Sequence, residues 1–416
     1  MRFFCFSVLL IEFVTGFVDR GFWLLNKFQH EADCEESYTI TIDKSIWRKA
    51  ASVLNQTALL NDDSIEQLTS VLTEITSPFG VSDPNIALQC PLAVAALLQR
   101  LALTLFNSSQ STWKRVLRMI HLAKLFYLHK YPDLGEFLES TRWPVSINDM
   151  MLVIRETRNF ERSNLEQIVA EDSRTSTDEH KVEIVSYCYY PGNGTQLPRW
   201  SRENKNAYAD HWGISIKHYN TPLARDSHAW MNKLLALEGS LASDVDWVMW
   251  VDCDAFFMNW EVHPQSVLAS TPNSANLVIS EDANMLNSGV FFLRNCEWSR
   301  NFLKTIKGLL NASSPFSFRD NAYHEQSPMM YWLFFPTGLE LGSSNLSPGY
   351  RPEVYLVYQK IINAYPPEIA LKSSFLQHDV YEQGDWIVSF NGCGSLLGGE
   401  YCEKMWSRYF DMSFHK

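Results

Sequence analysis

Two aspartates one residue apart, Asp252 and Asp254, are the residues of this sequence best suited to chemistry. They follow residues 245–251, a run rich in Val and Trp that predicts a strand buried on both faces of a parallel sheet. Ligands of open α/β sheets bind at the carboxyl ends of such strands. Two carboxylates there repel each other unless a cation joins them, so the pair predicts a metal site. The alternative is a strand that ends in a solvated turn.

The elements that must position this pair alternate in type. We predict strands at residues 182–190, 214–219, 245–251, 276–280 and 290–293, and helices at residues 199–212, 223–241 and 298–310. This alternation predicts an α/β sandwich with a mostly parallel sheet. No glycine-rich phosphate-binding motif follows the first strand, which favours a metal as the partner of a bound phosphate.

The N-terminal part of the chain has a different pattern. In residues 31–170 the apolar positions have helical spacing, which predicts a helical stem or accessory domain. The polar residues 171–181 are the predicted linker to a catalytic domain at residues 182–416. Residues 1–30 contain a short apolar run broken by Glu12, which predicts a signal peptide or a signal anchor. Either would deliver the chain to the secretory lumen.

Composition restricts the partners and the redox state. The 416 residues carry a net charge of −12 without a basic stripe, which argues against nucleic acid as a partner. The eight cysteines include no Cys-x-x-Cys pair. Cys393 and Cys402 are close enough in sequence to predict a disulfide, whereas Cys253 and Cys296 lie in apolar contexts and are predicted buried thiols. Five Asn-x-Ser/Thr sequons permit a glycoprotein without showing one.

Six stretches in the second half carry a resemblance to a known family. They are Ser201–Ala209, Trp247–Asn259, Leu286–Ser299, Glu325–Ser327, Gln359–Pro366 and Gly384–Val388. In this order and spacing, along about residues 181–410, they resemble glycosyltransferase family 34, the galactosyl-, mannosyl- and xylosyltransferases of the secretory pathway. The resemblance implies a GT-A fold (a Rossmann-like nucleotide-diphospho-sugar transferase), a divalent metal, usually Mn²⁺ or else Mg²⁺, and sugar transfer with retention at the anomeric carbon.

The resemblance also implies roles for single residues. Asp252 and Asp254 would bind the metal, which would bridge the donor diphosphate. The remaining roles fall on Asn287, Ser288, Gly289 and Asp385 for substrate binding, and on Glu325 and Gln326 for catalysis. For residues 287–289 the alternative is a plain turn between strands.

Two positions depart from the pattern of the family. The family usually has His-Phe-x-Gly-Cys near its C-terminus, with the His as a third metal ligand, and this chain has Ser389 there. Gly394 stands where some members have a Lys that meets the phosphates. Because a neutral hydroxyl is a poor replacement for imidazole, we expect weak metal affinity unless His378 or Asn391 supplies a ligand.

The sequence leaves two functions open. The first is a retaining glycosyltransferase of the secretory pathway, in the Golgi lumen, that moves a hexose or pentose from UDP-galactose, UDP-xylose or GDP-mannose to a glycan acceptor. It would meet the membrane only through an N-terminal anchor. The second is a degenerate relative that binds sugar nucleotide or glycan without turnover. A phosphatase with an aspartyl nucleophile is disfavoured, because Phe256 stands where that chemistry needs a small Thr or Val.

Overall fold

A computed structural model describes the C-terminal half of the chain and little of the rest. The described residues are 119, 180–191, 194–224, 228–282, 285–311, 318, 323–334, 350–370 and 380–414. The chain divides into two compact units, one of residues 1–157 and 309–343 and one of residues 158–308 and 344–416. The predicted signal segment, nearly all of the helical stem and most of the linker lie outside the described residues, so the predicted domain boundaries stay predictions.

A six-stranded sheet forms the centre of the second unit, in the order β2-β1-β3-β6-β5-β7. Its strands are β1 (Val182–Tyr187), β2 (Ser215–Tyr219), β3 (Trp247–Val251), β5 (Leu277–Asp282), β6 (Met285–Arg294) and β7 (Val354–Val357). β1 pairs in parallel with β2 and β3, and β5 pairs in parallel with β7. β6 alone runs antiparallel to its neighbours, β3 and β5. The predicted mostly parallel sheet is therefore confirmed.

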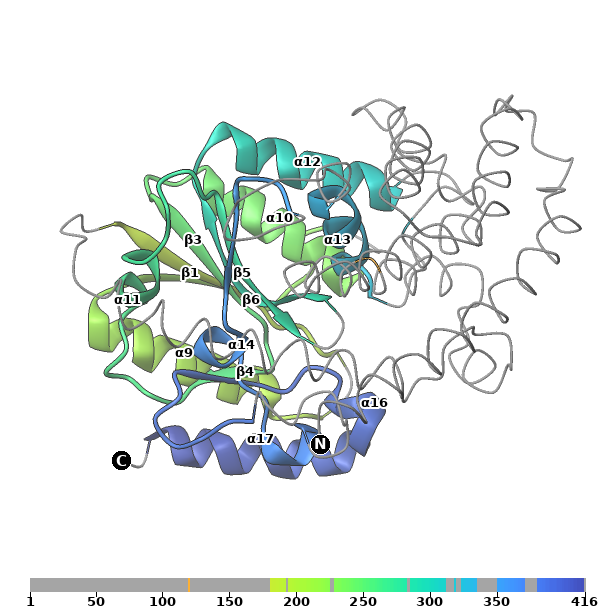
Figure 1. The fold of residues 1–416 in the computed structure, drawn as a ribbon. Helices are drawn as coiled ribbons and strands as arrows, with labels where there is room; N and C mark the ends of the chain where they lie inside the picture. Colours follow the sequence, from red (N-terminus) through yellow and green to blue (C-terminus); the bar gives the residue numbers. More distant parts are fainter. Residues whose placement is uncertain are drawn as a thin grey trace, which may run out of the picture. The chain divides into compact units, whose positions relative to one another are not determined.

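Helices cover both faces of this sheet, which explains why β1 and β3 are buried along their whole length. α10 (Ala229–Leu241) and α12 (Glu297–Asn311) lie along one face, and α9 (Leu197–Trp212) lies along the other (Figure 1). Met249 of β3 packs in one core cluster with Tyr208 of α9. The next residue, Trp250, has Lys233 of α10 over its ring. Successive side chains of β3 thus reach opposite layers, as the pleat requires.

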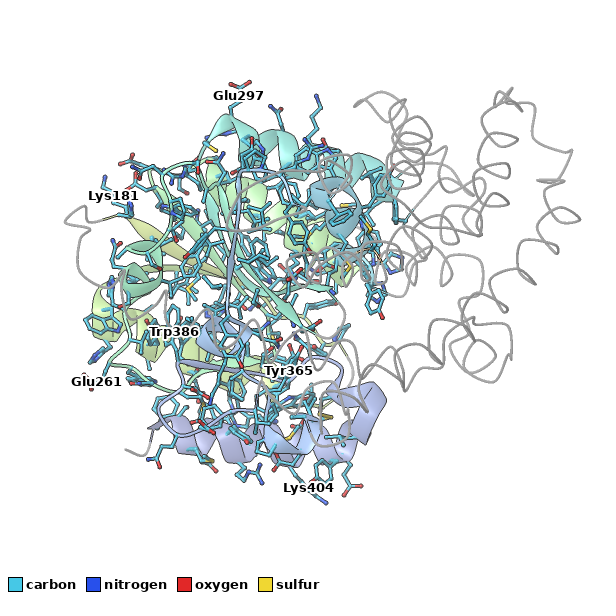
Figure 2. The ribbon with its side chains drawn as sticks, in the orientation of Figure 1. Lys181, Glu261, Glu297, Tyr365, Trp386 and Lys404 are labelled. Carbon is cyan, nitrogen blue, oxygen red and sulfur yellow. A yellow bond between two sulfur atoms is a disulfide. The ribbon has the colours of Figure 1, made fainter. Side chains whose placement is uncertain are left out.

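A smaller sheet continues the chain beyond the two aspartates. β4 (Ala255–Phe257) pairs antiparallel with β8 (Ile387–Ser389), and α17 (Gly399–Phe414) packs beneath them against α9 (Figure 1). The ring of Tyr208 stacks on Phe257, and its hydroxyl accepts a hydrogen bond from Trp386 Nε1 at 3.2 Å. Trp386 lies inside the fold, whereas Lys404 of α17 points outward (Figure 2). The other helices are α11 (Pro264–Leu268), α13 (Gln326–Phe334), α14 (Gln359–Ile362), α15 (Pro367–Ala370) and α16 (Cys393–Leu397).

Most predicted elements agree with the structure, and the exceptions have physical reasons. The helix predicted at residues 223–241 begins only at Ala229. β6 begins at Met285 rather than at residue 290, so residues 287–289 lie within a strand, and the alternative of a plain turn is wrong. β4, β7 and β8 were not predicted, because runs of three or four residues carry too little periodicity.

The cysteines gave one confirmed and one wrong prediction. Cys393 and Cys402 form the predicted disulfide. Cys253 is not a buried thiol, since it forms a disulfide with Cys188, 65 residues earlier. The neighbouring parallel strands β1 and β3 bring these two cysteines together, a proximity that sequence separation hides. Cys296 is free, as predicted, but only half-buried. Within the described ranges no helix is long and apolar enough to cross a membrane.

Candidate active site

The two aspartates follow the end of β3 and are tied to two other strands. Asp252 N donates to Gly289 O of β6 at 2.8 Å, and Phe390 N, just after β8, donates to Asp254 O at 2.9 Å. The carboxylate of Asp252 accepts a hydrogen bond from Trp250 Nε1 at 2.6 Å. The backbone therefore holds both residues where β3, β6 and β8 meet, at the end of a strand, where ligands of open α/β sheets bind.

The electrostatics of this pair favour an added cation. Burial, together with the negative charge of Asp252, raises the pKa of the Asp254 carboxyl to about 6. The positive charges of Lys205 and Lys233 oppose this pKa shift only in part. Burial also raises the pKa of the Tyr190 phenol, and the negative charges of Asp254 and Asp252 raise it as well. A divalent cation would relieve the repulsion between the two carboxylates.

Lys233 of α10 is a site residue that the sequence analysis missed. Its buried ammonium group lies 3.2 Å from Asp252 Oδ1 and donates to Ser288 O at 2.6 Å and to Ser288 Oγ at 3.3 Å. The same group lies 5.1 Å from the centre of the Trp250 ring. The signal in the sequence was a lysine within the apolar stripe of a helix, between Trp230 and Leu234, where burial of a charge requires a partner.

A second missed lysine lies on the opposite side of the aspartates. Lys205 of α9 is fully buried. Its Nζ donates to Ser201 Oγ and, at 3.3 Å, to Cys253 O, the carbonyl between the two aspartates. Burial lowers the pKa of Lys205 to about 7, against the opposing effect of Asp254 and Asp252. Lys205 belongs to a stretch that carries the family resemblance, but its packing beneath the aspartates was not predicted.

Asn287 uses its whole side-chain amide for contacts within the chain. Its Nδ2 donates to Asp282 Oδ2 at 2.9 Å and to the Tyr365 hydroxyl at 2.7 Å. Its Oδ1 accepts from Gly289 N at 2.8 Å and from Asn391 Nδ2 at 3.1 Å. An amide has two donor and two acceptor positions, and all four are filled. Asn287 therefore anchors the strand segment, and its predicted role in substrate binding stays a prediction.

Position 289 must be a glycine because the side chain of Asn391 lies too close for a Cβ atom. A Cβ atom at this position would lie 2.7 Å from Asn391 Nδ2 and 3.0 Å from Asn287 Oδ1. The absence of a side chain thus lets Asn391 reach Asn287. Asn391, one of the two replacements considered for the missing His, does lie at the site, whereas His378 is outside the described residues.

The oxygen atoms around the aspartates fit a hard divalent cation that takes further ligands from water and phosphate. Ser389 pairs with Ala255, next to Asp254, and its buried Oγ has no hydrogen-bond partner among the residues described. Two carboxylates with nearby neutral side-chain oxygens are the donor type that Mn²⁺ and Mg²⁺ prefer. Over the same residues, no group of three or more His, Cys, Asp or Glu could hold a metal.

The contacts described above do not test the roles of three predicted site residues. Asp385 accepts a hydrogen bond from Glu382 N at 2.7 Å and lies 3.6 Å from Lys360 Nζ. It precedes β8, at the opposite end of the β4–β8 pair from Asp254. Glu325 and Gln326 belong to the other compact unit, where Gln326 begins α13 as the sequence predicted. The roles of these three residues stay predictions.

Comparison with known proteins gives a consistent family. The model of the galactosyl transferase GMA12/MNN10 family matches residues 260–398. Glycosyltransferase 6 of Arabidopsis thaliana is 27% identical over 202 residues, which cover 45% of this chain and 41% of the relative. Putative glycosyltransferase 7 of the same plant is 27% identical over 215 residues, with coverages of 47% and 41%. The chain thus matches about two fifths of the length of these relatives.

Two solved structures are similar at a lower level. One is the crystal structure of a glycosyltransferase involved in the glycosylation of the major capsid of PBCV-1, with 14% identity and a TM-score of 0.41 over 55% of this chain and 98% of that chain. The other is the glycosyltransferase GlyE in Streptococcus pneumoniae TIGR4, with 10% identity and a TM-score of 0.34 over 57% and 61%. Both similarities are too weak to bear on the site.

The family match and the sequence relatives agree with the resemblance found in the sequence, and the central sheet is of the expected kind. The matched residues include the Asn287–Gly289 segment and Ser389, whereas the two aspartates lie just before them. Residues 260–398 of the chain therefore match the galactosyl transferase GMA12/MNN10 family, its listed relatives are glycosyltransferases, and its α/β fold is GT-A-like.

Proposed function

We propose that this protein transfers a hexose or pentose from a nucleotide sugar to a glycan acceptor, with retention at the anomeric carbon and with a divalent metal. The observation that carries the proposal is the Asp252–Asp254 pair at the end of β3, held against Gly289 and Phe390 by backbone hydrogen bonds. The raised pKa of Asp254 supports a site in which Lys205 and Lys233 only partly balance the two carboxylates until a cation binds.

Each part of the site has a task in this proposal. Asp252 and Asp254 would hold Mn²⁺ or Mg²⁺, which when bound would stabilise the negative charge on the departing nucleotide diphosphate. Lys233 holds Asp252 and Ser288 in one arrangement through the contacts described above. The hydroxyl of Ser288 is the group of this segment that we assign to the donor sugar. Glu325 and Gln326 are assigned to the sugars at the reacting centre, and Asp385 to substrate binding.

The proposal extends to the location of the enzyme. A family of secretory-pathway enzymes and an N-terminal apolar segment support action in the secretory lumen, and we assign the protein to the Golgi. The donor is one of the three used by the resembling family, UDP-galactose, UDP-xylose or GDP-mannose, and the acceptor is a glycan.

A panel of labelled nucleotide sugars tests the function. The purified protein is incubated with each donor, with and without Mn²⁺, and donor hydrolysis and transfer to oligosaccharides are measured. One donor is expected to react and to require the metal. Asp252→Asn and Asp254→Asn are expected to lower turnover at least about a thousandfold with the fold unchanged, because they remove the charge that holds the metal. Full metal-dependent transfer by either variant would show that the site is assigned wrongly.

A second candidate is binding of sugar nucleotide or glycan without turnover. It is favoured by Ser389 in place of the family His and by Gly394 in place of a Lys. Binding of UDP or GDP by the wild-type protein, without hydrolysis of any donor, would select this candidate over transfer.

A further inference from the structure

We propose that the Cys188–Cys253 disulfide is a positioning element of the donor site, which holds the segment Cys188–Tyr190 against the aspartates so that it forms a preformed wall for a nucleoside diphosphate. The inference rests on the proposed function, because it assumes that this edge of the sheet receives the nucleotide part of the donor. It assigns a role to a covalent link that no comparison describes.

The position of the link within the site is its first support. Cys253 is the residue between Asp252 and Asp254, and Cys188 is the first residue after β1. The disulfide therefore joins the ends of two neighbouring parallel strands, β1 and β3. β1 lies on the side of β3 opposite to β6, whose Gly289 O accepts the hydrogen bond from Asp252 N. Movement of the Cys188 segment would move Cys253, and with it both carboxylates.

The burial of the link is its second support. Cys188 and Cys253 are each 6% exposed and belong to one core cluster with Trp200 and Phe256. Lys205 Nζ donates to Cys253 O at 3.3 Å, and Cys188 N donates to Tyr219 O at 2.8 Å. Both cysteines are thus held by the surrounding helices and strands. The disulfide therefore fixes the position of Cys188 relative to Cys253 and does not join two loose segments.

The residues that follow Cys188 are its third support. Tyr189 and Tyr190 are among the few large apolar side chains exposed in the described structure, at 39% and 41%. Tyr190 is two residues from Cys188, which is bonded to the residue between Asp252 and Asp254. An exposed aromatic ring beside a diphosphate-binding pair can stack on a base, and such stacking strengthens binding. Without the disulfide, the chain would have to order these tyrosines when the nucleotide binds, which weakens affinity.

Binding of nucleotides to two disulfide variants tests the inference. Cys188→Ser/Cys253→Ser removes the link at the site, and Cys393→Ser/Cys402→Ser removes the other disulfide as the matched control. Isothermal titration calorimetry with UDP and with GDP, each in excess MnCl₂, measures the dissociation constants. We expect the dissociation constant of the preferred nucleotide to rise about tenfold in the first variant, from the cost of ordering the segment, and to stay within about twofold of wild type in the control.

Kinetics and a tyrosine variant separate positioning from general damage. With the donor that the panel identifies, KM for the donor should rise in the first variant in proportion to the dissociation constant, with kcat changed less than about threefold. Tyr190→Ala should weaken binding in the wild type and weaken it less in the variant without the link, because the two changes remove the same preorganisation. Equal binding by both disulfide variants, or equal weakening of both, overturns the inference. Failure of the wild type to bind either nucleotide overturns the proposed function as well.

A measurement on the wild-type protein serves if the first variant does not fold. Coupling between two sites is reciprocal, so a link that favours nucleotide binding is itself stabilised by the nucleotide. Under mild reductant, with alkylation and mass spectrometry of each cysteine, UDP or GDP with Mn²⁺ should slow opening of Cys188–Cys253 at least about threefold and leave Cys393–Cys402 unchanged. Equal rates of opening with and without nucleotide would overturn the inference.

Discussion

The buried ammonium group of Lys233 lies close to the carboxylate pair Asp252 and Asp254, so removing a single charge should change the activity of the site. Lys233 is 6% exposed at its side chain and lies 3.2 Å from Asp252 Oδ1. Breaking a buried ion pair by removing one partner leaves an uncompensated charge. In Lys233→Met the carboxylate of Asp252 would lose its nearest cation, and Ser288 O would lose a donor.

We therefore expect Lys233→Met to lower kcat/KM at least about tenfold in the transfer assay, while circular dichroism shows the native fold. Lys307→Met is the matched control, because Lys307 pairs with Glu238 of the same helix, α10, away from the aspartates. Its kcat/KM should stay within about twofold of wild type. Equal activity of the two variants would remove Lys233 from the site.

Ser389 gives a prediction about the metal itself. Its Oγ is buried beside the Asp254 backbone and has no hydrogen-bond partner among the described residues. Imidazole is a much better ligand than a neutral hydroxyl, so Ser389→His should tighten Mn²⁺ binding about tenfold or more, as measured by electron paramagnetic resonance. Ser389→Ala should leave Mn²⁺ affinity within about twofold and raise the thermal midpoint slightly, because it removes a buried unpaired group. Unchanged affinity in a folded Ser389→His variant would place the metal elsewhere.

Sequence reasoning found the site residues whose signal is local and missed those whose signal depends on the fold. Asp252 and Asp254 follow an apolar strand directly, so type and spacing were sufficient. Lys233 and Cys188 reach the aspartates only because α10 covers β3 and because β1 lies beside β3. Neither relation is visible from spacing along one chain.

At the scale of elements, the turn between β8 and α16 contacts β6 at Gly289, through the side chain of Asn391. Gly289→Ala would place a Cβ atom 2.7 Å from Asn391 Nδ2. A contact that short requires Asn391 to move, which breaks its hydrogen bond to Asn287 and loosens the connection between β6 and the segment after β8. We expect at least about a tenfold loss of kcat/KM with the fold retained, since misplacement by about 1 Å suffices for such losses.

Gly308→Ala is the control for this substitution. Gly308 lies on the exposed side of α12, and a Cβ atom there meets nothing within 4 Å. Activity should be unchanged, and the free energy of unfolding should rise by about 0.5–1 kcal/mol, because alanine is the better helix former. If Gly289→Ala kept full activity, Asn391 would have no part in the site.

The long elements were predictable and the direction of β6 was not. β1 and β3 each give a run of apolar residues, and α9 and α12 each repeat at helical spacing, so type and place followed from the sequence. The antiparallel β6 follows β5 after the short link Ala283–Asn284, which permits a hairpin rather than a crossover. A purely alternating pattern of strands and helices does not reveal that reversal.

At the scale of the whole molecule, the chain is acidic and its site needs cations. The net charge is −12, and the site gathers Lys205, Lys233 and a proposed divalent metal around two carboxylates. In the proposed function an anionic nucleotide would meet this positive charge within a negative protein, which would favour selective binding at that one place. Five of the six family blocks, all except Glu325–Ser327, lie in the compact unit that contains this centre.

We expect the whole fold to lose stability in acid, and part of this loss to come from His218 in the edge strand β2. Burial, together with the positive charges of Lys205 and Arg202, lowers the pKa of His218 to about 3. The ordinary pKa is about 6.5, so between pH 6.5 and 3 the unfolded chain binds a proton that the folded one does not. The stability is therefore fully present above pH 6.5 and is lost as the pH falls, at no more than about 1.4 kcal/mol per pH unit.

His218→Gln should remove this contribution. Urea unfolding at pH 7 and pH 5 is expected to show a smaller loss of stability for the variant than for the wild type, by about 1–2 kcal/mol. His228→Gln, at an exposed histidine before α10, should keep the wild-type dependence on pH. Because other groups also titrate in this range, the difference between variant and wild type is the quantity that decides. Parallel curves for His218→Gln and wild type would mean that the imidazole is solvated in the folded protein, and that β2 does not bury it at the edge of the sheet.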